Sequence, residues 1–520
     1  MRPMLRLDEG VGTSRQRAIA LGVMILEIHA YFMWAIGAAF GYDTVIYGQL
    51  GDALFTKGGL ERFYTGPRYY IFQHIAPGVG LLWGALSDLA GPYTWLLFAG
   101  LQHALAVGAL LYLLVVLGSG SLLPLWASIL AAVSVSFDPI YQSLHNTPMT
   151  ESITGSMFLI GMAAAIELLV SARPAWRSLT ILVAAGLVGA QFRSQFAVCI
   201  LMFLAVLACT KRDPRGWLKI GACALVVIAG ALAWPVYRYS TTGYAFLPNV
   251  DYIALESALR YNVRPSEAAM GALRSLPYPD GLSAERLAVD GMSYHDAARI
   301  GAHLRRNGFD DAAARNLLSG VARIVKWDSF VVIRNEMRLS LLSIGLKRVP
   351  FFGDPDAIIH RGFTVEGYLH HVRHWEKWEA GTLWRSYALE FERFFDDFRK
   401  DRELYDLEVV DRVHEHLTPY LVDHSIRTRD PLRMAEISSD LWVAGWIGAL
   451  FYLGRRHIGL VILLVSPVVA NYLVSLAVPI GNPRYAYPMM PMYTIGSVIF
   501  LSESWRVLPC IFRKGIRGAE

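Results

Sequence analysis

Charged residues are scarce in this sequence. Aspartate, glutamate, lysine and arginine together make up only 18% of the 520 residues. Soluble domains typically carry about 25% of these residues. This chain is instead 54% hydrophobic, with a mean hydropathy of +0.37. The composition therefore argues against an ordinary soluble domain and favours a protein embedded in a membrane.

Cysteines and nucleotide-binding motifs are also lacking. Only four cysteines occur, all in apolar runs or in the C-terminal tail, so disulfides cannot hold the long polar region together. The 48 lysines and arginines nearly balance the 43 acids, which gives no case for nucleic acid as a partner. The chain has no GxGxxG, P-loop or CxxC framework, so nucleotide sugars and ATP are disfavoured as direct substrates.

Long apolar runs, in contrast, recur along the chain. A membrane-spanning helix needs ~20 predominantly apolar residues. By this measure the sequence predicts an all-α polytopic membrane protein with about ten spans. The predicted spans are 17–40, 93–117, 121–138, 149–171, 177–192, 194–210, 216–237, 440–454, 457–479 and 485–503. The first run is longer than the core of a signal peptide, so we expect it to be an uncleaved span.

The basic residues predict how these spans are oriented. Arg2, Arg6, Arg15 and Arg17 precede the first span, which places the N-terminus in the cytoplasm. With ten spans, the later basic clusters, such as Lys211–Lys219 and the C-terminal tail, also fall in the cytoplasm. The segment 70–89 is apolar enough to span the membrane, but a crossing there would place the Lys211–Lys219 cluster outside. We therefore predict a short helix at membrane level within the first external loop.

This topology divides the chain into three regions. Residues 1–237 form an N-terminal membrane module with a first external loop at 41–92. Residues 238–439 form an external region in which apolar positions repeat at three and four residues, a spacing that predicts helices. Residues 440–520 contain the closing spans and a cytoplasmic tail.

Two acids and two arginines lie at the predicted outer ends of spans. These are Asp43, Glu151, Arg193 and Arg484. The arginines oppose the usual cytoplasmic bias of basic residues, which suggests that an external group uses them. Guanidinium binds phosphate oxygens in a bidentate fork, so a lipid phosphate is a fitting partner. The alternative is that either arginine extends to the lipid headgroups without a specific role.

Five segments resemble the GT-C superfamily of membrane glycosyltransferases, especially protein O-mannosyltransferases and lipid A aminoarabinose transferases. In chain order they are GYDTVIYGQL from Gly41, HIAPGVGLLWGAL from His74, HNTPMTESITGSMFL from His145, AAGLVGAQFRSQF from Ala184 and NPRYAYPMMPMYTIG from Asn482. The resemblance covers about half of the chain and departs from the family pattern at two places. Thr44 replaces a second acid, for which Asp52 is a possible substitute, and Ile75-Ala76 replaces the first proline after His74.

The resemblance implies a GT-C-like fold and a sugar donor linked to polyprenyl phosphate. It implies Asp43 as the catalytic base, Glu151 as a supporting acid, Arg193 and Arg484 as ligands of the donor phosphate, and Tyr47, His74 and Tyr485 as substrate-binding residues. A base must take the proton of the acceptor hydroxyl, and cations must stabilise the leaving phosphate. A single displacement would invert the configuration at the anomeric carbon of the sugar. The acceptor would be an envelope glycan, lipid or protein at the outer face of a bacterial inner membrane.

Two other functions and a metal stay open at the level of sequence. Glu27 and His29 lie inside the first predicted span, where ionisable residues usually serve a function, and they leave room for a transporter or flippase. An O-antigen polymerase or ligase would also join lipid-linked sugars outside. His370 and His374, with Glu366 before them, have the helical spacing of metal ligands. Surface histidines explain that spacing more simply, so a divalent metal is possible but no metal ligand is assigned.

The predicted topology can be tested by cysteine labelling in intact cells. Asp213→Cys lies in the basic cluster predicted to be inside, and Ser283→Cys lies in the region predicted to be outside. We expect a membrane-impermeant thiol reagent to label Ser283→Cys only, because the lipid bilayer shields the cytoplasmic side. The opposite labelling pattern would refute the predicted orientation.

Overall fold

The computed structural model describes an all-helical protein. It describes residues 11–36, 42–56, 59, 76–119, 122–170, 176–193, 195–210, 214–242, 265–290, 292, 294–327, 392, 395–396, 398–400, 406–418, 445–451, 453, 458–477 and 489–517. No strand occurs within these ranges. The predicted all-α class is therefore confirmed for the part of the chain that the structure describes.

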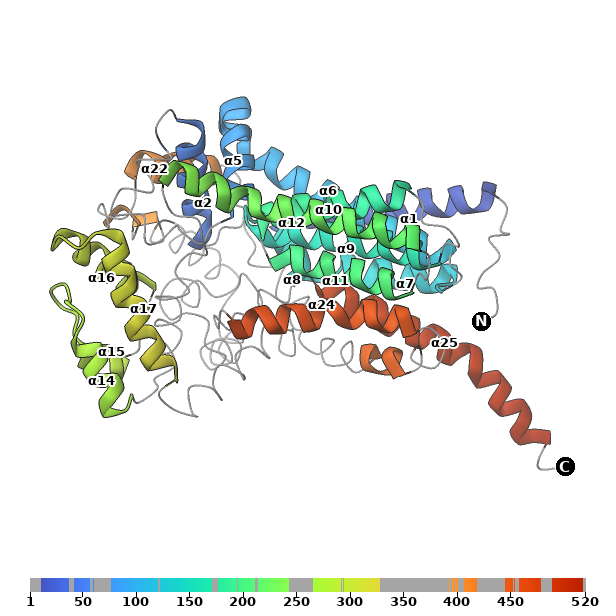
Figure 1. Cartoon of the computed structure of the whole chain (residues 1–520). Coiled ribbons are helices and arrows are strands. Elements are labelled where there is room, and N and C mark those ends of the chain that lie inside the picture. Colours follow the sequence, from blue (N-terminus) through green and yellow to red (C-terminus); the bar gives the residue numbers. More distant parts are fainter. Residues whose placement is uncertain are drawn as a thin grey trace, which may run out of the picture.

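Most of the helices form one elongated bundle (Figure 1). Its members are α1 (Val11–Ile36), α6 (Thr94–Ser119), α7 (Leu125–Ser136), α8 (Pro139–His145), α9 (Thr150–Val170), α10 (Trp176–Phe192), α11 (Gln195–Thr210), α12 (Pro214–Thr242), α24 (Ile458–Ala477) and α25 (Met490–Arg517). Two short helices, α2 (Tyr42–Phe55) and α5 (Pro77–Ala90), lie in the first loop, and the 3-10 turn η1 (Gly91–Tyr93) joins α5 to α6. The long polar region contributes α14 (Glu267–Arg274), α15 (Ala284–Asp290), α16 (Tyr294–Arg306), α17 (Asp311–Trp327) and α22 (Leu407–Leu417).

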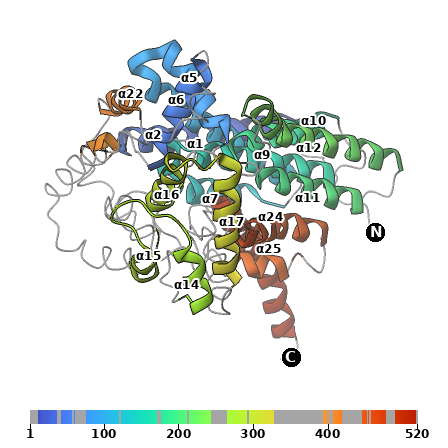
Figure 2. The same ribbon diagram turned by 60° about the vertical axis from the view of Figure 1, so that its left-hand side comes forward.

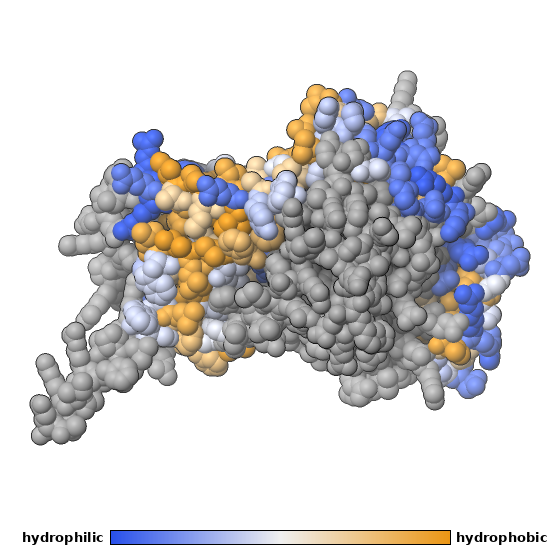
Figure 3. All heavy atoms as spheres, turned by 180° about the vertical axis from the view of Figure 1, so that it is seen from behind, coloured by the Kyte–Doolittle hydropathy of each residue, from blue (hydrophilic) through white to orange (hydrophobic). Residues whose placement is uncertain are grey.

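Four stretches of the described chain are long and apolar enough to cross a membrane. They are Arg15–Trp34, Pro77–Ser119, Thr150–Val170 and Arg215–Tyr237. Several shorter apolar helices accompany them, including Leu125–Ser136, Trp176–Phe192, Phe196–Thr210 and Ile458–Ala470. Figure 3 shows hydrophobic side chains gathered over the bundle and hydrophilic ones toward its two ends. These features indicate a multi-pass membrane protein.

Helices occur where the sequence predicted spans, but several are shorter than expected. Of the described residues in the predicted span 121–138, only α7 is helical, with 12 residues, and α8 begins just after the span, at Pro139. The predicted short helix within 70–89 corresponds to α5, which continues through η1 into α6. The number of helices that cross the bilayer therefore stays a prediction beyond the four stretches named above.

The two chain ends lie at the same end of the bundle. α1 begins and α25 finishes at that end, whereas α2, α22 and α14–α17 lie at the opposite end (Figures 1 and 2). This separation is expected if the bundle crosses a membrane and the polar helices lie on one side of it. Which side faces the cytoplasm stays a prediction.

The centre of the bundle is α9. It contacts α6, α10, α11 and α24, and every side chain from Thr150 to Leu159 is buried. Small residues make such close packing possible in membrane helices, because they let neighbouring backbones approach. At Gly161, for example, an added Cβ would lie 2.9 Å from the side chain of Ile200 on α11.

Glycines also set the contact between α2 and α5. An added Cβ on Gly51 would lie 2.7 Å from the Gly80 carbonyl and 3.1 Å from the Gly84 amide nitrogen, so the two backbones touch. An added Cβ on Gly84 would lie 2.6 Å from the ring of Phe55. Because Gly51 faces Gly80 and Phe55 faces Gly84, the two helices run in the same direction.

The α2–α5 contact yields a prediction about stability. In Gly51→Ala the new methyl group meets backbone, which cannot rotate away, so we expect a loss of ~1–3 kcal/mol, the usual cost of overpacking. Thermal unfolding in detergent micelles measures it. The matched control is Gly100→Ala on α6, where an added Cβ meets no atom within 4 Å. Equal stability of the two variants would contradict this account of the α2–α5 contact.

Candidate functional site

Four of the predicted site residues fall within the described structure. Asp43 lies in the first turn of α2 and is half-buried, and Tyr47 follows one turn later and is buried. Glu151 and Arg193 are both buried, with 0% and 9% of their surface exposed. The other three predicted residues, His74, Arg484 and Tyr485, lie outside the described residues, so their roles stay predictions.

Glu151 and Arg193 bind each other. The Arg193 Nη2 donates to Glu151 Oε1 in a close ion pair. Arg193 Nε donates to Thr150 Oγ1 at 2.9 Å, and Thr150 Oγ1 donates to the second oxygen of Glu151 at 3.0 Å. Both carboxylate oxygens thus accept a hydrogen bond, which a buried carboxylate requires.

The local structure explains why these charges lie here. Glu151 occupies the first turn of α9, and Arg193 directly follows the last residue of α10. A negative charge stabilises the N-terminus of a helix and a positive charge its C-terminus. The ion pair therefore joins two helix ends whose dipoles favour these charges. The sequence predicted both residues at this end but gave them separate roles, and it did not predict their pairing.

Helix α5 brings α2 to the same place. An added Cβ on Gly78, at the start of α5, would lie 2.8 Å from both the carbonyl oxygen of Gln191 and the ring of Phe192. The beginning of α5 therefore contacts the end of α10, next to Arg193. Since α2 runs in the same direction as α5, its Asp43 end points toward this contact as well. We call the region where α5 lies between α2 and the joined ends of α9 and α10 the α2–α9–α10 corner.

The turn that leads into Glu151 is held by side chains of α6. Gln102 donates both of its amide hydrogens to backbone carbonyls of this turn, at 3.0 Å to His145 and 2.9 Å to Thr147. Trp95 Nε1 donates to the Asn146 carbonyl at 3.3 Å. The last carbonyls of a helix have no partner within it, and α6 supplies the missing donors at the end of α8.

Three buried histidines lie beside this turn. The ring centroids of His29, His103 and His145 are 5.3 Å apart in all three pairs. His29 Nδ1 lies 3.0 Å from His103 Nδ1, and His103 Nε2 lies 3.4 Å from Asn146 Oδ1. An amide oxygen only accepts, so neutral His103 carries its hydrogen on Nε2 and receives one from His29. Burial lowers the pKa of His145, and the two neighbouring histidines lower it further.

The sequence pointed only to His29 in this cluster. His103 and His145 sit in or next to apolar runs on other helices, and only the packing of α1, α6 and α8 brings them together. Within the described ranges, no three histidine, cysteine, aspartate or glutamate side chains are arranged to hold a metal ion. Glu366, His370 and His374 lie outside the described residues, so the possible divalent metal stays untested.

The Glu151–Arg193 pair can be tested by a double-mutant cycle. Removing one partner of a buried ion pair leaves an uncompensated charge and costs about 3–5 kcal/mol. We therefore expect Glu151→Gln and Arg193→Met each to lower stability strongly, and the double variant to lose less than their sum. Denaturation in detergent measures the stability of the wild type, the two single variants and the double variant. Glu27→Gln, on the exposed side of α1, is the control. Additive losses would show that the two side chains do not interact.

A comparison of the sequence with protein-family models, with curated proteins and with solved structures found no match. The functional assignment of the α2–α9–α10 corner therefore depends on its own residues. These are the half-buried Asp43 and the buried network of Thr150, Glu151 and Arg193.

Proposed function

We propose that this protein is an inverting glycosyltransferase. It would move a sugar from a polyprenyl-phosphate carrier to a glycan, lipid or protein acceptor at the outer face of a bacterial inner membrane. The observation that carries the proposal is the α2–α9–α10 corner. There one helix, α5, contacts both the helix of Asp43 and the helix end beside Arg193, in a protein built from membrane-spanning helices.

The topology that goes with this proposal has about ten spans, with both termini in the cytoplasm. In that orientation the α2–α9–α10 corner faces the outer interface, where the phosphate of a lipid carrier lies. The polar helices α14–α17 and α22 are at the same end of the bundle (Figure 1). An acceptor that arrives from the aqueous side would then meet the donor at this corner.

The proposed reaction is a single displacement at the anomeric carbon of the sugar. Asp43 takes the proton from the acceptor hydroxyl while the acceptor oxygen forms its bond to this carbon. The bond from the carbon to the phosphate oxygen breaks, and polyprenyl phosphate leaves with the bonding electrons. Half-burial suits this base, because its carboxylate must meet an acceptor and yet be shielded from bulk water.

The ion pair modifies the role proposed for Arg193. A donor phosphate at this corner would compete with Glu151 for the guanidinium, which binds carboxylate and phosphate by the same bidentate geometry. Glu151 would then hold Arg193 in place before the donor arrives and contribute to the charge balance around the sugar. Arg484 is the second cation in the proposal. Tyr47, His74 and Tyr485 are its substrate-binding residues.

The histidine cluster favours a second candidate function. Ionisable residues inside a membrane module usually face protein or water and often mark a transport path. His29 and His103 are such residues, and they lie next to the turn that precedes Glu151. A transporter or flippase would move its substrate without changing a covalent bond. An O-antigen polymerase or ligase would form one, so covalent product analysis separates the transport function from both transferase functions.

The proposed function can be tested through Asp43. In Asp43→Asn the size of the side chain is kept and the basic oxygen is lost, so we expect sugar transfer to fall by ~10²–10⁴. Mass spectrometry of cell-envelope glycans identifies the product, and transfer assays with membranes then measure the rate. Binding of a polyprenyl-phosphate sugar should survive, because the proposal assigns the phosphate contacts to Arg193 and Arg484 and not to Asp43.

The matched control for this test is Asp88→Asn. Asp88 is an exposed acid near the end of the neighbouring helix α5. Asp52 is unsuitable as a control, because it forms an ion pair with Arg412. If Asp43→Asn folded and transferred sugar as fast as Asp88→Asn, Asp43 would have no catalytic role.

A further inference from the structure

Helix α22 is amphipathic and packs with its apolar face inward. Val409, Val410, Val413 and Leu417 are all buried, whereas Asp411 and Glu408 are exposed. The helix begins with a side-chain cap, because Asp406 Oδ1 accepts a hydrogen bond of 3.1 Å from the Glu408 amide. A short helix of this kind needs a partner surface, since propensity alone does not stabilise 11 residues.

That partner surface lies on α2 and α5, far away in the sequence. An added Cβ on Gly48 would lie 2.5 Å from Val413, so the side chain of Val413 sits directly on the backbone of α2. The ring of His416 lies 6.0 Å from the ring of Trp83 on α5. Burial lowers the pKa of His416, and the guanidinium of Arg412 lowers it further, which favours an uncharged ring at this apolar contact.

One ion pair crosses the same contact. Arg412 Nη1 donates to Asp52 Oδ1 at 3.0 Å, between residues 360 positions apart. Both side chains are about one-third exposed, and exposed pairs contribute only ~0.2–1 kcal/mol. The apolar contacts therefore supply most of the binding energy, and the ion pair selects one position of α22 along α2. Gly48 and Asp52 are four residues apart, so they face α22 from the same side of α2.

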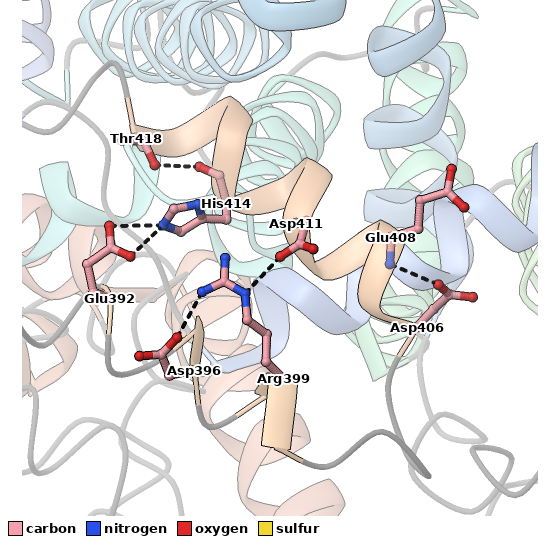
Figure 4. Close-up of polar contacts among 8 residues, drawn as sticks. All are labelled: Glu392, Asp396, Arg399, Asp406, Glu408, Asp411, His414 and Thr418. Atoms are coloured by element: carbon pink, nitrogen blue, oxygen red, sulfur yellow. Dashed lines mark hydrogen bonds and ion pairs between the residues drawn. The ribbon is translucent and has the colours of Figure 1, made fainter.

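The other side of α22 forms ion pairs and hydrogen bonds with the rest of the polar region. Arg399 donates to Asp411 at 2.8 Å and to Asp396 at 3.0 Å, and His414 lies 3.0 Å from Glu392 (Figure 4). These contacts link α22 to the segment 392–400, so α22 connects that segment with α2.

From these contacts we infer that Arg412 is a positioning residue, which fixes α22 on α2 and thereby sets the orientation of Asp43. This inference deepens the proposed function and rests on it. Asp43 is five residues before Gly48, which places it on another side of α2. Helix α22 can therefore orient Asp43 without covering it. In this arrangement Asp52 serves the docking of α22 and does not replace the second acid of the GT-C pattern.

A cysteine pair tests the docking without reference to activity. Gly48→Cys with Val413→Cys places two thiols across the α2–α22 contact, where the closeness of Gly48 to Val413 suits a disulfide. We expect rapid oxidative cross-linking in otherwise unchanged protein. Adding Arg412→Ala should slow the cross-linking several-fold, and the charge swap Arg412→Asp with Asp52→Arg should restore it. Cross-linking that is equally fast with Arg412→Ala would overturn the inference.

The matched control is Arg399→Ala. Arg399 is also a partly exposed, ion-paired arginine of the polar region, but its partners Asp396 and Asp411 belong to the polar region itself. We expect Arg399→Ala to leave cross-linking between positions 48 and 413 unchanged. If Arg399→Ala slowed cross-linking as much as Arg412→Ala does, the loss of any ion pair would loosen α22. That result would also overturn the specific role of Arg412.

Sugar transfer, measured without the cysteines, connects the docking to the reaction. Arg412→Ala should lower kcat about ten-fold with little change in KM, because an interaction made in the transition state is disturbed. The charge swap should recover kcat, because it restores the ion pair between positions 412 and 52. A normal kcat together with slow cross-linking would overturn the positioning role. If the wild type transferred no sugar while cross-linking behaved as expected, the proposed function would fail and the docking through Arg412 would stand.

Discussion

A buried charge needs a partner, and this requirement organises the most polar part of the bundle. Glu151 lies at the start of the most central helix, where water cannot solvate it. Arg193 and Thr150 satisfy its two oxygens. Because Arg193 follows α10, the ion pair fixes how the start of α9 meets the end of α10. The turn before Glu151 is restrained in the same way by Gln102 and Trp95 on α6.

The first-loop helices follow a different principle, since they meet through glycines and not through charges. Gly51 and Gly80 bring the backbones of α2 and α5 into contact, and Gly78 brings α5 against the end of α10. Such contacts allow few alternative positions, because backbone atoms cannot rotate out of the way. They therefore hold α2, the helix that carries Asp43, at a defined place. The corner thus combines a charge network on one side with close backbone packing on the other.

The sequence predicted the helices well and the contacts between them poorly, for a physical reason. Apolar length reports whether a segment is stable inside a bilayer, so most predicted spans correspond to helices. The bias of basic residues predicted that Asp43, Glu151 and Arg193 share one end. The pairing of Glu151 with Arg193 depends on how α9 and α10 are rotated about their axes, which hydropathy does not report. The partnership of Asp52 with Arg412 joins residues 360 positions apart, and no local pattern indicates it.

The short length of α2 explains why such distant contacts matter for the site. Its 14 residues would form only a marginal helix in isolation, since isolated helices of that length barely repay the cost of nucleation. Packing on α5 and α22 must therefore supply the order that the helix lacks. The orientation of Asp43 is then a tertiary property, set as much by Val413 and Arg412 in the polar region as by the first loop itself. The polar region and the membrane module are accordingly joined into one structural unit through the contact of α22 with α2.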